Sequence, residues 1–134
     1  MTAWSHLPNA KHIDRIIADL KKNPGAWGAT QDTAWIVTQD TAWNAAWSAA
    51  RITAMAEERI ATWGVAYDSV YDITTLNKRN SAWGAILALI AYDDCAYLFD
   101  EKIEHVQMLA LLGNEQAILL YPACVAMQKE INEI

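Results

Sequence analysis

The hexapeptide TQDTAW occurs twice, at 30–35 and 38–43, so that Trp27, Trp35 and Trp43 follow one another at eight-residue intervals. An α-helix turns by about 100° per residue, and an eight-residue step therefore rotates a side chain by about 80° around the helix axis. Three tryptophans spaced in this way cannot share one stripe of a straight helix. The region must either form one helix that is contacted on several sides or break into shorter helices.

Helix is the secondary structure that the sequence favours throughout. Alanine is abundant and has the highest helix propensity, whereas the 134 residues include only five glycines and three prolines. Near the start, Ile13, Ile16, Ile17 and Leu20 recur at i, i+3, i+4 and i+7. This spacing predicts a short amphipathic helix that Asn9 caps and Asn23-Pro24 ends.

The remaining elements are predicted from runs of helix-forming residues and from the capping, glycine and proline residues that bound or interrupt them. We predict a helix over 42–71, a loop over 72–81, and a helix that Ser81 caps. Asp100 is predicted to cap a short helix that ends at Gly113, and a last helix contains Pro122. Because no strand alternation is present, the chain is predicted to be one all-α domain over 1–134. We expect a compact bundle of about five to six helices that forms an oligomer.

Charge and hydropathy exclude several classes of protein. The formal net charge is −6, and the basic residues are not clustered, which argues against nucleic-acid binding. The longest apolar stretch, AILALIAY, is too short to span a membrane, and the first residues do not resemble a signal peptide. Cys95 and Cys124 lack metal or redox spacing. We therefore expect a cytoplasmic protein with reduced thiols and no membrane partner.

Motifs for catalysis, metals and cofactors are missing from the sequence. It contains no glycine-rich phosphate loop and no nucleophile elbow. The three histidines form no i, i+4 pair, and the ExxEH segment at 101–105 has no duplicate of the kind that a di-metal bundle requires. The expectation is a protein without metal or cofactor that is not an enzyme.

Aromatic and charged side chains supply the candidate ligand-binding residues. Large aromatic residues on helices usually belong to a core, but seven tryptophans pointing in many directions exceed what one small bundle is expected to cover. Some should lie at a subunit interface, which predicts a homo-oligomer. Others are expected to stack on a planar ligand whose phosphate meets an arginine. The predicted residues are Trp27, Trp35, Trp43, Trp47 and Arg51.

Two further candidates come from the segment YDDCAY. If the helix after Ser81 continues through this segment, Asp94 lies in the apolar stripe of Trp83, Leu87, Ile90 and Leu98, and Asp93 lies beside it. A carboxylate in such a stripe is costly unless it is paired or hydrogen-bonded. We therefore predict that Asp94 is buried. It is either a structural partner or, with Asp93, a polar anchor for ligand hydroxyls.

The chain resembles a group of small, uncharacterised proteins of bacteriophages and prophages that are rich in Ala-Trp and Ala-Arg repeats. The resemblance rests on HIDRIIADLKKNP, the Ala/Trp repeats, LALIAYDDCAYLFD and LLGNEQAILLYPACVAM, of which ALIAYDDCAY is the most specific. It covers nearly the whole chain and implies a viral accessory protein of no known activity. Small phage proteins outside the virion often counter host defences, and some sequester a nucleotide second messenger.

Three hypotheses follow for the function. The first is an anti-defence protein of the host bacterial cytoplasm that sequesters a nucleotide-derived signal, of the cyclic ADP-ribose, ADP-ribose conjugate or cyclic nucleotide class, without catalysis. The second is an inhibitor that binds a host defence protein through an aromatic surface. The third is an enzyme that cleaves such a signal. Plentiful aromatic residues and absent catalytic motifs favour binding, and we expect the first.

Overall fold

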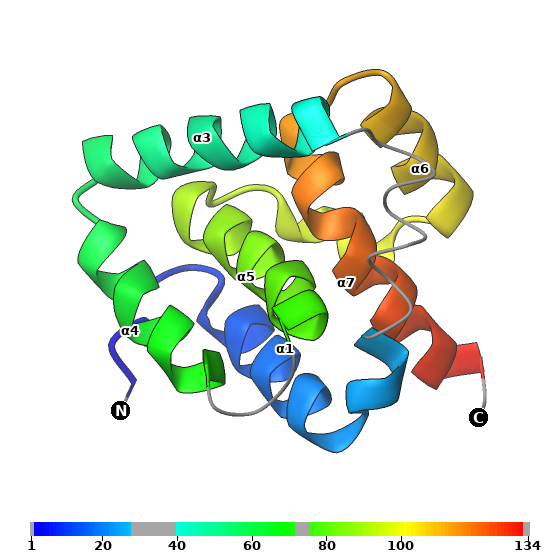
Figure 1. The fold of residues 1–134 in the computed structure, drawn as a ribbon, viewed down its shortest axis with the longest axis horizontal. Coiled ribbons are helices and arrows are strands. Elements are labelled where there is room, and N and C mark those ends of the chain that lie inside the picture. The colour runs from blue at the N-terminus through cyan, green and yellow to red at the C-terminus, as the bar shows by residue number, and fades with distance from the viewer. Residues whose placement is uncertain (1, 28–39, 72–75, 133–134) are drawn as a thin grey trace.

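The computed structural model describes residues 2–27, 40–71 and 76–132 (Figure 1). These residues form seven helices of defined bounds and no strand. They are α1 (Ala10–Lys22), α3 (Asp40–Ala56), α4 (Ile60–Tyr71), α5 (Leu76–Ala91), the 3-10 helix η1 (Ala96–Asp100), α6 (Ile103–Leu111) and α7 (Glu115–Asn132). The all-α prediction is confirmed. The predicted count of five to six helices was too low, because the chain divides the 42–71 region and adds η1.

Helix α1 forms where the apolar spacing predicted it. Ile13, Ile16 and Ile17 are buried, and the helix ends before Asn23, whose backbone N–H donates to the carbonyl of Asp19. Asn9 lies at the predicted N-cap position, but its side chain makes no cap hydrogen bond to α1. It donates instead to the carbonyls of Leu89 and Tyr92, at the far end of α5. The start of α1 is therefore fixed to the end of another helix.

The predicted single helix over 42–71 is wrong, because the chain breaks between α3 and α4. The N–H of Arg59 donates to the carbonyl of Ala54 at 2.7 Å, and the N–H of Glu58 donates to that of Met55 at 3.1 Å. Glu58 has a φ of 59°, in the left-handed region. This is the hydrogen-bond pattern of a Schellman motif, which ends a helix. The turn redirects α4 away from α3.

Replacing Glu58 with glycine should stabilise the protein. A left-handed backbone costs an L-residue with a side chain roughly 1–2 kcal/mol but costs glycine nothing, so Glu58→Gly should raise the free energy of unfolding by about 1 kcal/mol. Thermal unfolding followed by circular dichroism measures the change. The control is Ala45→Gly at an exposed position inside α3, which should lower stability by about 1 kcal/mol. Equal losses from both variants would contradict the role of Glu58.

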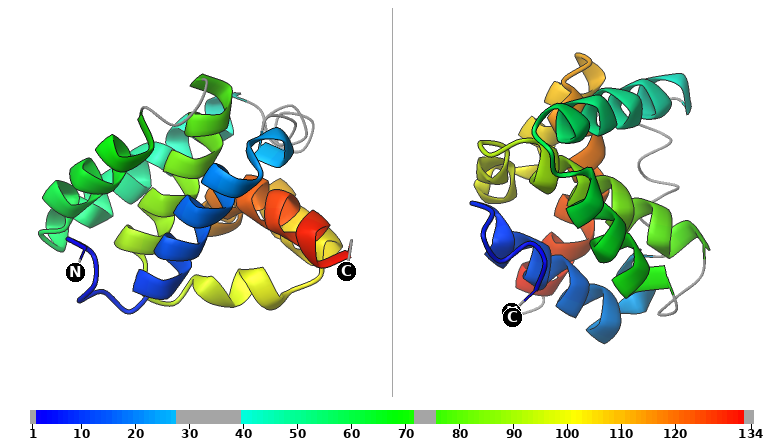
Figure 2. Two further views of the ribbon diagram at one scale, coloured as in Figure 1. Left: turned by 90° about the horizontal axis from the view of Figure 1, so that it is seen from below. Right: turned by 90° about the vertical axis from the view of Figure 1, so that its left-hand side faces the viewer.

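Helix α5 forms the centre of the molecule and contacts α1, α3, α4 and α7 (Figure 1). Every residue from Ala82 to Ala91 is buried. The helix begins at Leu76, so Ser81 is not its cap, and residues 76–81 of the predicted 72–81 loop are helical, whereas 72–75 lie outside the described residues. Figure 2 shows α1 running alongside α5. The apolar face of α1 thus closes one side of the core.

The last elements complete the core around α7. Asp100 is the final residue of η1, so it does not cap α6, whose N-cap is Lys102. Gly113 ends α6 as predicted, with a φ of 89°, and the N–H of Asn114 donates to the carbonyl of Leu109. Pro122 lies inside α7, where it is buried. Among the described residues, no helix is long and apolar enough to cross a membrane.

Candidate binding groove between α3 and α4

A groove of about 560 Å³ lies where α4 turns away from α3. Helix α3 contributes Trp47 and Arg51, which are four residues apart and so share one face of the helix. Helix α4 contributes the remaining wall, with aromatic, small and acidic side chains. The lining from α4 is Ala61, Trp63, Gly64, Val65, Tyr67 and Asp68.

The aromatic side of the groove belongs to a continuous series of rings. Trp47 meets Trp63 edge to face with centroids 5.7 Å apart and an interplanar angle of 83°. Trp63 in turn meets Tyr67 at 5.3 Å and 61°. Buried Trp43 extends the series on the other side of Trp47, at 6.4 Å. Edge-to-face pairs are favourable arrangements of aromatic quadrupoles, so neighbouring rings hold one another in place.

Tyr67 fixes this wall to the central helix. Its ring stacks on Trp83 of α5 with centroids 3.8 Å apart and planes 17° apart. The indole N–H of Trp83 donates to the backbone carbonyl of Tyr67 at 3.2 Å. Trp83 is only 4% exposed and belongs to the core. Because Tyr67 of the groove packs on it, the shape of the groove depends on the packing of the core.

Trp63 carries an unsatisfied polar group beside the groove. Its Nε1 is buried and has no hydrogen-bond partner in the part of the chain that the structure describes. A buried N–H donor without a partner costs about 1–3 kcal/mol and is uncommon in native proteins. A ligand oxygen that reached this donor after a small turn of the indole would remove the penalty.

Of the predicted ligand-binding residues that the structure describes, only Trp47 and Arg51 line this groove. Trp27 is fully buried, and its Nε1 donates to the buried carboxylate of Asp19 at 2.8 Å. Trp43 is 9% exposed and packs against Gly84 of α5. Trp35 lies outside the described residues. One chain therefore accommodates Trp27 and Trp43 in its own interior, contrary to the argument that their directions require a partner.

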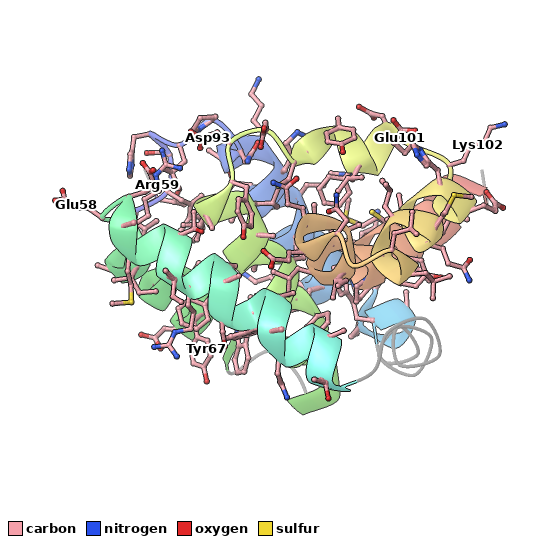
Figure 3. All side chains as sticks on the ribbon, turned by 90° about the horizontal axis from the view of Figure 1, so that it is seen from above. Glu58, Arg59, Tyr67, Asp93, Glu101 and Lys102 are labelled. Atoms are coloured by element: carbon pink, nitrogen blue, oxygen red, sulfur yellow. The ribbon has the colours of Figure 1, made fainter. Side chains whose placement is uncertain are left out.

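The two aspartates of YDDCAY lie elsewhere. The prediction that Asp94 is buried is wrong, because its side chain is exposed. The physical reason is that α5 ends at Ala91, so that helical spacing does not extend to Asp94. Asp93 is also exposed, and it pairs with Arg59 at 2.6 Å. Figure 3 shows Arg59 and Asp93 together near Glu58, on the flank of α3 opposite Tyr67.

Arg59 is a structural residue in this arrangement. Its Nη1 donates both to the Asp93 carboxylate and to the carbonyl of Ile90, near the end of α5. The hydrogen bond with Asp93 is the main cause that raises the pKa of Arg59 above its ordinary value. Arg59 therefore joins the α3–α4 turn to the end of α5.

Sequence reasoning missed three polar or aromatic residues of the groove: Trp63, Tyr67 and Asp68. The i, i+4 spacing of Trp63 and Tyr67 was a usable signal, because such residues share a helix face. It was obscured because 42–71 was predicted to be one helix. In one straight helix, residues so far apart in sequence cannot face Trp47 and Arg51 across a groove.

Neither cysteine forms part of the groove. Both are buried, and burial raises the pKa of each thiol to about 12, which keeps it protonated near neutral pH. The described residues contain no cluster of three or more His, Cys, Asp or Glu side chains placed to hold a metal ion.

Comparison with known proteins finds no relative for this chain. No family model, no curated protein and no solved structure matches it.

Proposed function

We propose that this chain is a binding protein that sequesters a nucleotide-derived signal without catalysis. The ligand is of the cyclic ADP-ribose, ADP-ribose conjugate or cyclic nucleotide class, and it occupies the groove between α3 and α4. Its base stacks on the aromatic wall, its phosphate meets Arg51, and Asp68 accepts hydrogen bonds from ribose hydroxyls. Arg51 suits this role because its planar fork of donors matches phosphate geometry.

The observation that carries this proposal is the convergence of Trp47, Trp63 and Tyr67 with Arg51 and Asp68 around one groove. Small-molecule sites are usually hollows of about 300–1,000 Å³ lined by aromatic side chains and a few polar groups. The volume of about 560 Å³ falls in this range. Stacking of a base on an aromatic ring contributes about 1–3 kcal/mol.

The biological role in the proposal follows from the resemblance to phage Ala/Trp-repeat proteins. An accessory protein that captures a signalling nucleotide in the host cytoplasm would prevent a defence effector from receiving it. Such a protein needs affinity and abundance, and it needs no turnover.

A second candidate function, inhibition of a host defence protein by direct binding, is favoured by exposed apolar side chains. Ile52 and Met55 on α3 are 67% and 56% exposed, and Met108, Leu111 and Leu112 at the end of α6 are 57%, 61% and 77% exposed. Apolar patches of this kind often mark protein-binding surfaces.

Titration of the purified protein with candidate ligands tests the proposal. Intrinsic tryptophan fluorescence and calorimetry are followed against 3′- and 1″-linked cyclic ADP-ribose, ADP-ribose, cyclic mononucleotides and cyclic dinucleotides. At least one should bind with micromolar or tighter affinity, and its binding should weaken with added salt because a phosphate meets Arg51. A flat response to the whole panel from folded, ligand-free protein would favour the protein-binding alternative.

Gly64 offers a way to fill the groove without disturbing the fold. Apart from its two chain neighbours and the backbone of its own helix, no described heavy atom lies within 4 Å of the position that a Cβ would take at Gly64, so the space there is open. Gly64→Leu should therefore leave the chain folded and weaken ligand binding at least about tenfold, because its side chain occupies the groove. The control is Gly25→Leu, at an equally open position outside the groove. Equal binding by both variants would place the ligand elsewhere.

A further inference from the structure

The groove is open on the side away from its lining, so the described residues of one chain would cover only part of a ligand in it. Established small-molecule sites bury about 70–90% of the ligand surface. Apolar side chains next to the groove are also left uncovered: Val65 on its wall is 51% exposed, and Ile52, which follows Arg51 on α3, is 67% exposed. A second surface that covered this face would bury both the ligand and these side chains.

This face carries one positive and one negative side chain, so two copies of it can be complementary in charge. Arg51 on α3 and Asp68 on α4 both line the groove, and both are exposed. Among the described residues, they form no ion pair with each other or with another side chain. In a two-fold interface, if one residue contacts a second across the axis, the second contacts the first. One Arg51 and one Asp68 per chain can therefore form two reciprocal ion pairs.

The shape of α4 permits a close approach at the same place. Ala61, Gly64, Val65 and Asp68 recur at i, i+3, i+4 and i+7, so they share the face of α4 that borders the groove. Gly64 at the centre of this face leaves the helix backbone bare, with open space where a side chain would stand. Because glycine has no side chain, another molecule can approach the helix backbone more closely at Gly64 than it could at any other type of residue.

We propose that a second copy of this chain packs by two-fold symmetry on the α3–α4 face. Arg51 of each copy pairs with Asp68 of the other, and the two grooves close into one shared cavity. A guanidinium carries five N–H donors, so Arg51 can hold a carboxylate on one edge and a ligand phosphate on another. The nature of the ligand in this cavity rests on the proposed function, whereas the pairing of the two copies does not.

Charge reversal on the ligand-free protein tests this interface. Arg51→Asp and Asp68→Arg are made singly and together, and the dimer dissociation constant is measured by sedimentation equilibrium. Each single reversal places like charges opposite one another twice per dimer, so it should weaken the dimer about a hundredfold. The double reversal restores opposite charges and should return the constant to within about threefold of the wild-type value.

Leu112→Glu at the exposed end of α6 is the control, because it disrupts the other apolar patch and should leave the dimer intact. Circular dichroism verifies that each variant is folded. A wild-type protein that stays monomeric at about 100 μM, single reversals that leave the dimer unchanged, a double reversal that stays dissociated, or dissociation by Leu112→Glu would each overturn the proposal.

Binding measurements on the same variants separate this inference from the proposed function. A dimer that obeys the reversal pattern but binds no nucleotide would overturn the proposed function and leave the interface standing. A monomer that binds a nucleotide tightly would overturn the proposed interface and leave the proposed function standing.

Discussion

Asn9→Asp should remove a large part of the stability of this protein. The Asn9 side chain is 4% exposed, and its Nδ2 donates to the carbonyls of Leu89 at 2.9 Å and Tyr92 at 2.8 Å. A carboxylate cannot donate either bond, and it would lie against the negative end of the α5 dipole. A buried, unpaired charge typically costs about 3–5 kcal/mol, out of a total stability that is usually about 5–15 kcal/mol. Urea unfolding measures the loss.

The pH dependence of this variant follows from the same burial. Desolvation and nearby carbonyl oxygens should raise the folded-state pKa of the new carboxyl group above its unfolded value. The neutral form is then favoured by folding, so part of the lost stability should return as the pH falls from neutrality toward about 4. Asn9→Ala, which removes both hydrogen bonds without adding a charge, should lose less and show no such pH trend. An Asn9→Asp variant with wild-type stability at neutral pH would contradict the role of Asn9.

Local patterns predicted the parts of this fold that are determined locally. The spacing of Ile13, Ile16 and Ile17 defines α1 because a helix face repeats within a few residues. Gly113 marks the end of α6 because few residues other than glycine adopt its positive φ readily. In both cases the residues that determine the structure are close neighbours in the sequence.

The predictions were wrong where the local structure depends on residues that are distant in the sequence. Glutamate is a good helix former, and no sequence signal marks Glu58 as left-handed. The turn there is joined to the end of α5 by the bond from Arg59 to Ile90, across 31 positions. Similarly, Asn9 satisfies the carbonyls of Leu89 and Tyr92 at the end of α5 from 80 and 83 positions away. The prediction for Asp94 extended the helical spacing of α5 beyond Ala91, because the contact with Asn9 could not be recognised from the sequence.

The candidate site shows the same division. The abundance of tryptophan and a neighbouring arginine in this region predicted Trp47 and Arg51, which line the groove. Their counterparts on α4 could be recognised only after the direction of α4 was known, because that direction depends on the turn at Glu58. Burial of Trp43 likewise depends on a partner on another helix, namely Gly84 of α5.

Gly84→Ala should be strongly destabilising because Gly84 accommodates the ring of Trp43. A Cβ at Gly84 would lie 2.7 Å from both Cη2 and Cζ2 of Trp43, which is too close for carbon atoms. The indole is rigid, buried and in contact with Trp47. Overpacking of this kind costs about 1–3 kcal/mol, and we expect a net loss of about 2 kcal/mol, or about 8 °C in melting temperature. Differential scanning calorimetry measures the shift.

Two comparisons assign this loss to the contact with Trp43. Gly25→Ala makes the same replacement in another helical turn, where the space is open, and should instead raise stability by about 0.5–1 kcal/mol through helix propensity. In a Trp43→Phe background the clashing atoms of the indole are gone, so adding Gly84→Ala should cost at least about 1 kcal/mol less than it does in the wild type. Strictly additive losses would show that Gly84 is needed for a reason other than this ring. A displaced Trp43 would also shift Trp47. If the groove binds a nucleotide as proposed, Gly84→Ala should weaken that binding even at temperatures where the variant is fully folded.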